Sequence, residues 1–196
     1  MSATLLLRTL WHVPPGELLT RIRRNHALEH ATMNLLSHRY PNAQIAGMSG
    51  PLGFTLISTL TGEQIIPTIR QALDSLKMGD GDLALHENCG TNLVVTAALT
   101  TLATLAGLGS LARPRNREKR MSLRWLERLP QIVLLNTVAL MAASPLSRWV
   151  QANVTTNADL QDMEVASIVT DYRGRLHHIS VHTRHADAIQ HIELTS

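Results

Sequence analysis

Hydrophobic and polar residues follow a helical period after Pro15, and this pattern predicts a helix that continues to about Arg39. Apolar stretches separated by glycines then predict two strands, over 44–48 and 54–60, joined by a turn around 49–51. A second amphipathic helix is expected over 64–77, followed by a short strand over 82–86. The first part of the chain is therefore expected to form an α-β-β-α-β unit.

The apolar pattern becomes continuous in the middle of the chain. Residues 91–112 contain no charged side chain, and as a helix they would rise about 33 Å, close to the hydrocarbon thickness of a bilayer. A second apolar segment, 129–146, contains Asn136 and Pro145. The two segments predict a transmembrane or membrane-embedded hairpin. A buried helical hairpin in a soluble protein is the alternative interpretation.

Strand-like alternation returns over 165–171 and 176–183 and predicts a β-hairpin around 172–174. The predicted class is therefore α+β: a small α-β-β-α-β unit plus a C-terminal β-hairpin, interrupted by a two-helix membrane hairpin. We expect an α+β domain over 1–90, a membrane hairpin over 91–150 and a C-terminal region over 151–196. The last region has the strands needed to complete the N-terminal sheet.

A basic loop, 113–128, joins the two apolar segments and carries seven Lys and Arg residues. The positive-inside rule places such a loop in the cytoplasm. Both flanking regions would then lie outside, although no secretory signal is recognised at the N-terminus. The alternative is a hairpin that dips in from the cytoplasmic side, with its loop at anionic headgroups.

The expected location is a cell membrane, with the 113–128 loop on its cytoplasmic side. The lipid bilayer is the expected partner, and other membrane protein subunits are further candidates. The formal net charge is only +3 and aromatic residues make up 3% of the chain. Basic and aromatic residues do not interleave as single-stranded nucleic acid favours, so we expect no nucleic-acid partner.

The most distinctive polar pattern lies in the first predicted helix, which contains His26, Glu29 and His30. Positions i, i+3 and i+4 share one face of a helix, so these three side chains are expected to point the same way. Two imidazoles one turn apart can bind a transition metal, and a nearby carboxylate can accept a proton. Ordinary hydrogen-bonded helix histidines are the alternative.

A second group of candidate ligands, His86, Glu87 and Cys89, precedes the first apolar segment. If the helix histidines and one of these residues bind zinc, a position stays open for water, and Glu29 is the candidate catalytic base of a hydrolase. If both His86 and Cys89 bind, the site has four ligands and is structural. Glu87 is the alternative ligand.

The segment His26-Ala27-Leu28-Glu29-His30 resembles the signature of the pitrilysin-type inverted zincin metallopeptidases. In that family the third ligand is a glutamate downstream of the motif, a role that the resemblance assigns to Glu87. The match covers this segment alone, and the chain is much shorter than those enzymes.

The chain as a whole is similar to a family of small uncharacterised bacterial membrane proteins, a domain of unknown function. The similarity lies in His26–Ala31, in His86 with Asn88–Asn92, in Pro145-Leu146, and in Gln151 with Thr155-Thr156. It implies that the two motifs belong together and names no reaction. Two hypotheses follow: a membrane-anchored zinc peptidase, or a non-catalytic accessory or assembly protein with a structural His/Cys site.

Overall fold

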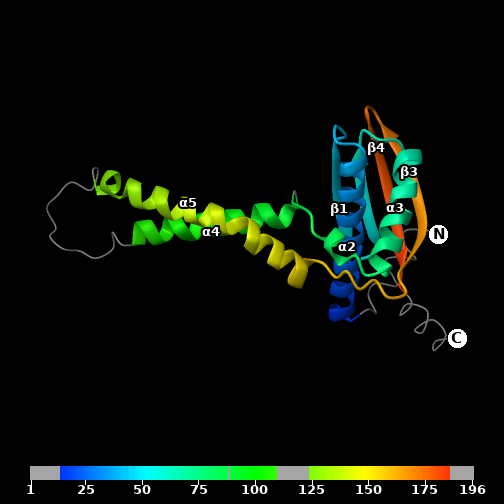
Figure 1. Cartoon of the computed structure of the whole chain (residues 1–196), viewed down its shortest axis with the longest axis horizontal. Helices are drawn as coiled ribbons and strands as arrows, with labels where there is room; N and C mark the ends of the chain where they lie inside the picture. Colours follow the sequence, from blue (N-terminus) through cyan, green and yellow to red (C-terminus); the bar gives the residue numbers. More distant parts are fainter. Residues whose placement is uncertain (1–13, 88, 110–123, 186–196) are drawn as a thin grey trace. The chain divides into compact units, whose positions relative to one another are not determined.

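The computed structural model describes residues 14–87, 89–109 and 124–185, with the backbone alone over 124–127. The chain divides into two compact units, of which the first holds the residues up to His86 and those from Ala152 onward. Its described elements are α2 (Pro15–Arg39), β1 (Ile45–Gly50), β2 (Gly53–Ser58), α3 (Gly62–Lys77), the 3₁₀ turn η1 (Gly81–Ala84), β3 (Glu164–Arg173) and β4 (Leu176–Arg184). This mixture of helices and an antiparallel sheet confirms the α+β class (Figure 1).

The sheet of the first unit has the strand order β1-β2-β4-β3, and all its neighbours are antiparallel. Strand β4 lies between β2 and β3, so the C-terminal hairpin and the N-terminal hairpin form one sheet. Their pairing sets Leu56 opposite Ile179 and Phe54 opposite Val181. All four side chains are at most 3% exposed, because the alternation of each strand turns them to the same covered face.

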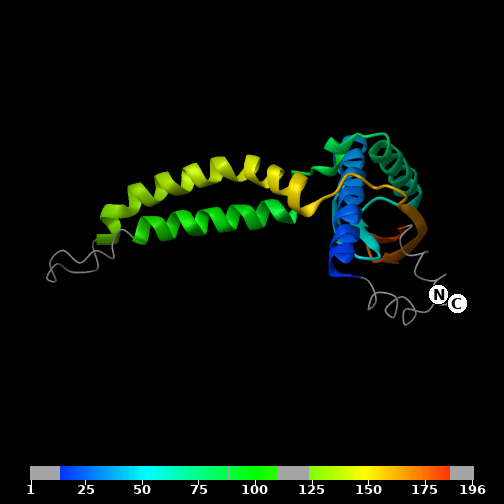
Figure 2. The same cartoon turned by 90° about the horizontal axis from the view of Figure 1, so that it is seen from below.

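Helices α2 and α3 cover that face of the sheet (Figure 2). Leu28 and Leu36 of α2 are fully buried in one hydrophobic cluster with Ile65 and Ile69 of α3 and with the strand residues. The apolar stripe of α2 thus fixes the rotation of the helix about its axis. That rotation decides which way its polar residues point.

The strand expected over 82–86 is wrong, because the chain forms the 3₁₀ turn η1 there. The side-chain amide of Asn34 donates hydrogen bonds to the carbonyls of Leu83 and Leu85, at 2.9 and 2.8 Å. These carbonyls therefore bond to a helix side chain instead of a strand ladder. The turn between β1 and β2 also falls later than predicted, at 51–52, since β1 extends to Gly50.

The second unit, Glu87–Gln151, contains α4 (Gly90–Gly109) and α5 (Arg124–Val150); the π-helical turn η2 (Gln151–Thr155) follows α5. Helices α4 and α5 pack against each other. A Cβ on Gly107 would lie 2.6 Å from a side-chain carbon of Ile132, which shows how closely the helices approach. The amide of Asn136 donates to the hydroxyl of Thr104 across the same interface, at 3.1 Å.

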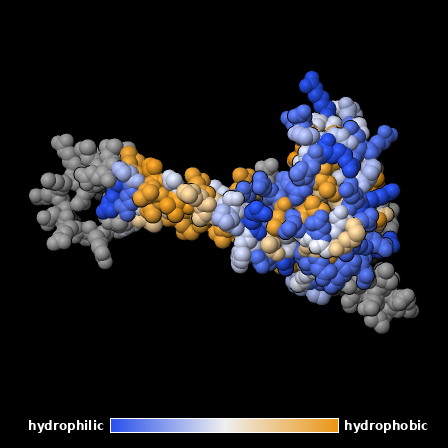
Figure 3. Space-filling view, viewed as in Figure 1, coloured by the Kyte–Doolittle hydropathy of each residue, from blue (hydrophilic) through white to orange (hydrophobic). Residues whose placement is uncertain are grey.

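Both segments of the hairpin are long and apolar enough to cross a membrane, over Gly90–Gly109 and Arg128–Thr155. Only 6% of each apolar window is buried, as helices that face lipid would be. Apolar side chains cover the visible face of this unit (Figure 3). Among the most exposed are Leu93, Val94, Leu102, Leu134 and Met141.

Candidate metal centre

The two histidines of α2 each bond to the backbone of a different chain segment. The Nδ1 of His30 is 2.8 Å from the carbonyl oxygen of Ala84, and the Nδ1 of His26 is 3.0 Å from that of Thr155. A carbonyl oxygen only accepts hydrogen bonds, so Nδ1 is the protonated nitrogen in both rings. In the neutral form of each ring, Nε2 then carries the lone pair, as in histidines that bind a metal.

The rings of His26 and His30 lie next to each other on α2. The ring centroids of His26 and His30 are 4.2 Å apart with an edge-to-face angle of 64°. His30 is 2% exposed and His26 is half-buried. The ring of His86, itself buried, has its centroid 5.7 Å from that of His30. Three imidazoles from the two sequence motifs thus lie close together within the first unit.

Cys89 follows shortly after His86, so chain connectivity keeps its thiol in this neighbourhood. One atom of Cys89 and one ring nitrogen each of His26 and His30 all lie within 4.8 Å of one another. Ligand atoms around one tetrahedral zinc ion are about 3.5 Å apart, so small side-chain shifts would bring these three into coordination distance. This His-His-Cys cluster can hold a metal ion.

The sulfur of Cys89 sits at the start of α4. The backbone N–H of Thr91 donates to it at 3.4 Å, and the backbone N–H of Asn92 donates to the Cys89 carbonyl at 2.9 Å. The thiol in turn donates to the hydroxyl of Thr91, also at 3.4 Å. These contacts hold the side chain of Cys89 against the first turn of the helix.

Glu29 points toward the sheet. Its Oε2 accepts a hydrogen bond from the hydroxyl of Ser49 on β1, and the residue is 4% exposed. Its Oε1 occupies space beside Gly47, where an added Cβ would lie only 2.2 Å from that oxygen. The glycine at this place in β1 therefore makes room for the carboxylate.

Glu87, the alternative ligand, is exposed, and its backbone carbonyl accepts a hydrogen bond from the side chain of Asn92. In the part of the chain that the structure describes, the cluster of ligand atoms consists of His26, His30 and Cys89, and it includes neither Glu87 nor His86.

Two arginines of α2 also hold the chain segment that contains Thr155, and the sequence pattern did not single them out. Arg23 donates to the carbonyls of Asn153 and Thr156, both at 3.0 Å, and Arg24 donates to that of Asp159 at 2.9 Å. The cluster of basic residues at 21–24 was the available signal. The sequence pattern does not identify the partners, because they are backbone carbonyls more than 100 residues further along the chain.

Asn25 adds a third anchor, on the sheet. It is fully buried; its amide donates to the carbonyl of Gly50 at 2.7 Å, and its oxygen accepts from the hydroxyl of Thr183 at 2.7 Å. Because Asn25 directly precedes His26, the bonds to β1 and β4 limit any sliding or rotation of α2 at the start of the motif.

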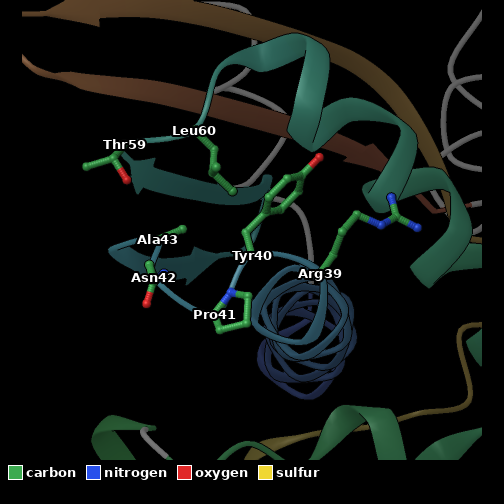
Figure 4. A pocket seen from close by; sticks show the side chains of 7 residues that line it. All are labelled: Arg39, Tyr40, Pro41, Asn42, Ala43, Thr59 and Leu60. Atoms are coloured by element: carbon green, nitrogen blue, oxygen red, sulfur yellow. The ribbon is translucent and has the colours of Figure 1, made fainter.

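A shallow hollow of about 400 Å³ lies at the C-terminal end of α2 (Figure 4). The guanidinium of Arg39 points to α3, where it donates to Thr68 at 3.1 Å and to Gln71 at 3.0 Å. The charged group of this hollow is thus engaged in joining the two helices. The remaining lining residues are Tyr40, Pro41, Asn42, Ala43, Thr59 and Leu60.

Fold and site together define an α+β protein with two candidate membrane-spanning helices and a possible His/His/Cys metal site. The chain belongs to the family described as "Domain of unknown function (DUF6391)", whose model matches residues 21–168. It is also 33% identical, over 196 residues, to an uncharacterised protein of Picosynechococcus sp.. That alignment covers 93% of this chain and 89% of the relative. No solved structure matches the chain.

The family match confirms the resemblance to an uncharacterised family. The matched range includes the helix motif, the second motif and both candidate spans.

The contact between Glu29 and Gly47 yields a stability prediction. Gly47→Ala places a methyl group against the buried carboxylate, and we expect the free energy of unfolding to fall by about 1–3 kcal/mol. Gly50→Ala is the matched control on the same strand, because the nearest atom to its added Cβ is 4.0 Å away. Chemical denaturation of both variants in detergent measures the difference. Equal stabilities would show that the carboxylate does not need this space.

Proposed function

We propose that the chain is a membrane-anchored metal-binding protein, with His26, His30, His86 and Cys89 as the ligands of one transition-metal ion. The observation that carries the proposal is the pair of Nδ1–H bonds to the carbonyls of Ala84 and Thr155. Such bonds fix the tautomer and orientation of metal-binding histidines and raise the basicity of the opposite nitrogen. The arrangement favours a built site over an accidental pair of helix histidines.

The donor set favours zinc. Imidazole nitrogen and thiolate sulfur suit zinc, whereas magnesium and calcium prefer oxygen ligands. Three imidazoles and one thiolate fill a tetrahedral shell, as in structural zinc sites. His86 is the candidate for the fourth position: the centroid of its buried ring is 5.7 Å from that of His30, and the ring would have to move closer to reach the ion. We therefore favour a structural centre in an accessory or assembly protein.

A zinc-dependent hydrolase, most simply a peptidase, is the second candidate. It is supported by the His-x-x-Glu-His spacing on α2 and by the two Nε2 lone pairs. Zinc would supply Lewis acidity, and Glu29 would have to accept and return a proton as general base. The bond from Ser49 and the burial of Glu29 beside β1 favour a supporting role for this carboxylate instead.

The orientation in the membrane follows from charge. The basic residues of the 113–128 loop exceed those near the other ends of α4 and α5, where Lys77 and Arg148 are the nearest on either side. The positive-inside rule then places the loop in the cytoplasm. Two spans joined by that loop leave the α+β unit on the opposite side of the bacterial inner membrane. Lipid, and other membrane subunits, are its expected partners.

Metal analysis tests the site. Full-length protein purified in detergent without chelators is expected to carry about one zinc per chain, measured by plasma mass spectrometry. His30→Gln and Cys89→Ser remove a ligand each and are expected to lose most of the metal. His178→Gln, on β4 and outside the cluster, is the matched control and keeps it. A wild-type protein that binds no transition metal after zinc addition would refute the proposal.

The Glu29→Gln variant separates the two candidate functions. The amide oxygen can still accept the hydrogen bond from Ser49, so we expect the zinc content to stay unchanged. For a structural centre, zinc-loaded wild type and variant cleave a quenched fluorescent peptide library equally poorly. Cleavage by wild type that is lost in Glu29→Gln would establish the hydrolase instead.

Labelling of an added cysteine in intact cells tests the orientation of the protein in the membrane. Met78→Cys reports the α+β unit, because Met78 is 80% exposed after α3. Asn116→Cys reports the basic loop; residues 113–123 lie outside the described residues, and 124–128 form the start of α5. We expect a membrane-impermeant maleimide to label Met78→Cys, and Asn116→Cys only after permeabilisation. Each variant also contains Cys89, so the labelling of wild-type protein serves as the background. Protection of both positions would instead support a hairpin that dips in from the cytoplasmic side.

A further inference from the structure

The two histidines of α2 are bonded to the two stretches of chain that connect the first unit to the hairpin. Ala84, the partner of His30, lies in η1, shortly before α4 begins at Gly90. Thr155, the partner of His26, ends η2, which directly follows α5. The entry segment (81–86) and the exit segment (152–159) are thus each held by one candidate metal ligand.

Other polar bonds of α2 go to the same two segments. Asn34 binds two carbonyls of the entry segment, and Arg23 binds two of the exit segment. Arg23 also accepts at its backbone carbonyl, from the N–H of Asn157 at 3.0 Å. Neither segment belongs to the sheet. Their backbone is therefore ordered mainly by contacts with one helix.

A cation on Nε2 would change the hydrogen bond at the opposite side of each ring. It withdraws electron density, so the Nδ1–H becomes a stronger donor, and bonds with a charged partner are roughly twice as strong as neutral ones. Loading the site would strengthen the bonds to Ala84 and Thr155 together. The two segments would then be held more tightly than in the metal-free protein.

Resting on the metal site proposed above, we propose that metal occupancy controls how firmly the entry and exit segments are fastened to α2, and so how firmly the hairpin is attached to the α+β unit. The coupling is reciprocal by thermodynamic linkage. Loosening either segment must weaken metal binding, even when no ligand is altered. When the supply of the transition metal falls, the site would lose its ion and the two segments would be held less firmly by α2.

Hydrogen exchange tests the first half of this coupling in the full-length wild type. The protein in nanodiscs is compared after zinc loading and after removal of zinc with a chelator. We expect amide exchange in the entry and exit segments to slow by about tenfold on loading, within the usual range of coupling between sites. Helix α3 serves as the internal control and is expected to change little. Unchanged exchange in both segments, with zinc bound, would overturn the inference.

Zinc affinity tests the reciprocal half. Arg23→Met removes bonds to the exit segment, and Asn34→Leu removes bonds to the entry segment; neither residue is a proposed ligand. Arg39→Met is the matched control, because Arg39 lies on the same helix but bonds to α3. Competition with a chromophoric chelator is expected to show affinity reduced about tenfold in the first two variants and unchanged in the control.

The outcomes separate the inference from the function on which it rests. A wild type that binds no zinc refutes the metal site itself. Zinc that binds with equal affinity in wild type, Arg23→Met and Asn34→Leu leaves the site standing and refutes the coupling. Equal losses in all three variants, including Arg39→Met, would refute it as well, because they would reflect a general weakening of α2.

Discussion

Helix α2 must satisfy a row of buried polar side chains, and the described structure of the first unit depends on how it does so. Asn25 is fully buried, His30 and Glu29 are 2% and 4% exposed, and Arg24 is 6% exposed. A buried polar group without a partner costs about 1–3 kcal/mol, more if charged. Arg24 and His30 bond to backbone carbonyls outside the sheet, whereas Asn25 and Glu29 bond to groups on β1 and β4. One requirement therefore orders both the helix and the irregular chain around it.

The same requirement shapes the candidate metal site. A histidine that must donate to a carbonyl can take only the tautomer that leaves Nε2 unprotonated, so the ligand form is set before any ion arrives. Binding to a preorganised site loses less conformational entropy than binding to mobile side chains. The contacts that stabilise the first unit thus also set the tautomer of the two histidines in the candidate site.

Sequence reasoning predicted the parts that periodicity controls. Both helices of the first unit, its strand pairs and the two apolar segments follow local patterns that packing did not override. The prediction of a strand over 82–86 was wrong. The side-chain amide of Asn34 donates hydrogen bonds to two carbonyls of this stretch, which therefore do not pair with another strand. Those bonds join residues far apart in the chain, and no local pattern encodes them.

The candidate site shows the same division. Spacing placed His26, Glu29 and His30 on one side of a helix, but the direction of the Glu29 carboxylate depends on Gly47 and Ser49 of β1. The acceptors Ala84 and Thr155 contribute only backbone atoms, so their side chains carry no signal at all. Residues that act through the backbone are invisible to motif reasoning.

The position of β4 between β2 and β3 has a consequence for biosynthesis. Strand β2 leaves the ribosome long before β4, and the whole hairpin is translated between them. Until β4 arrives, one edge of β2 lacks its neighbour and the face carrying Leu56 is incompletely covered, a condition that favours aggregation. The sheet can close only after the apolar segments have been synthesised. Maturation of the α+β unit therefore has to wait for synthesis of the apolar hairpin that interrupts it in the sequence.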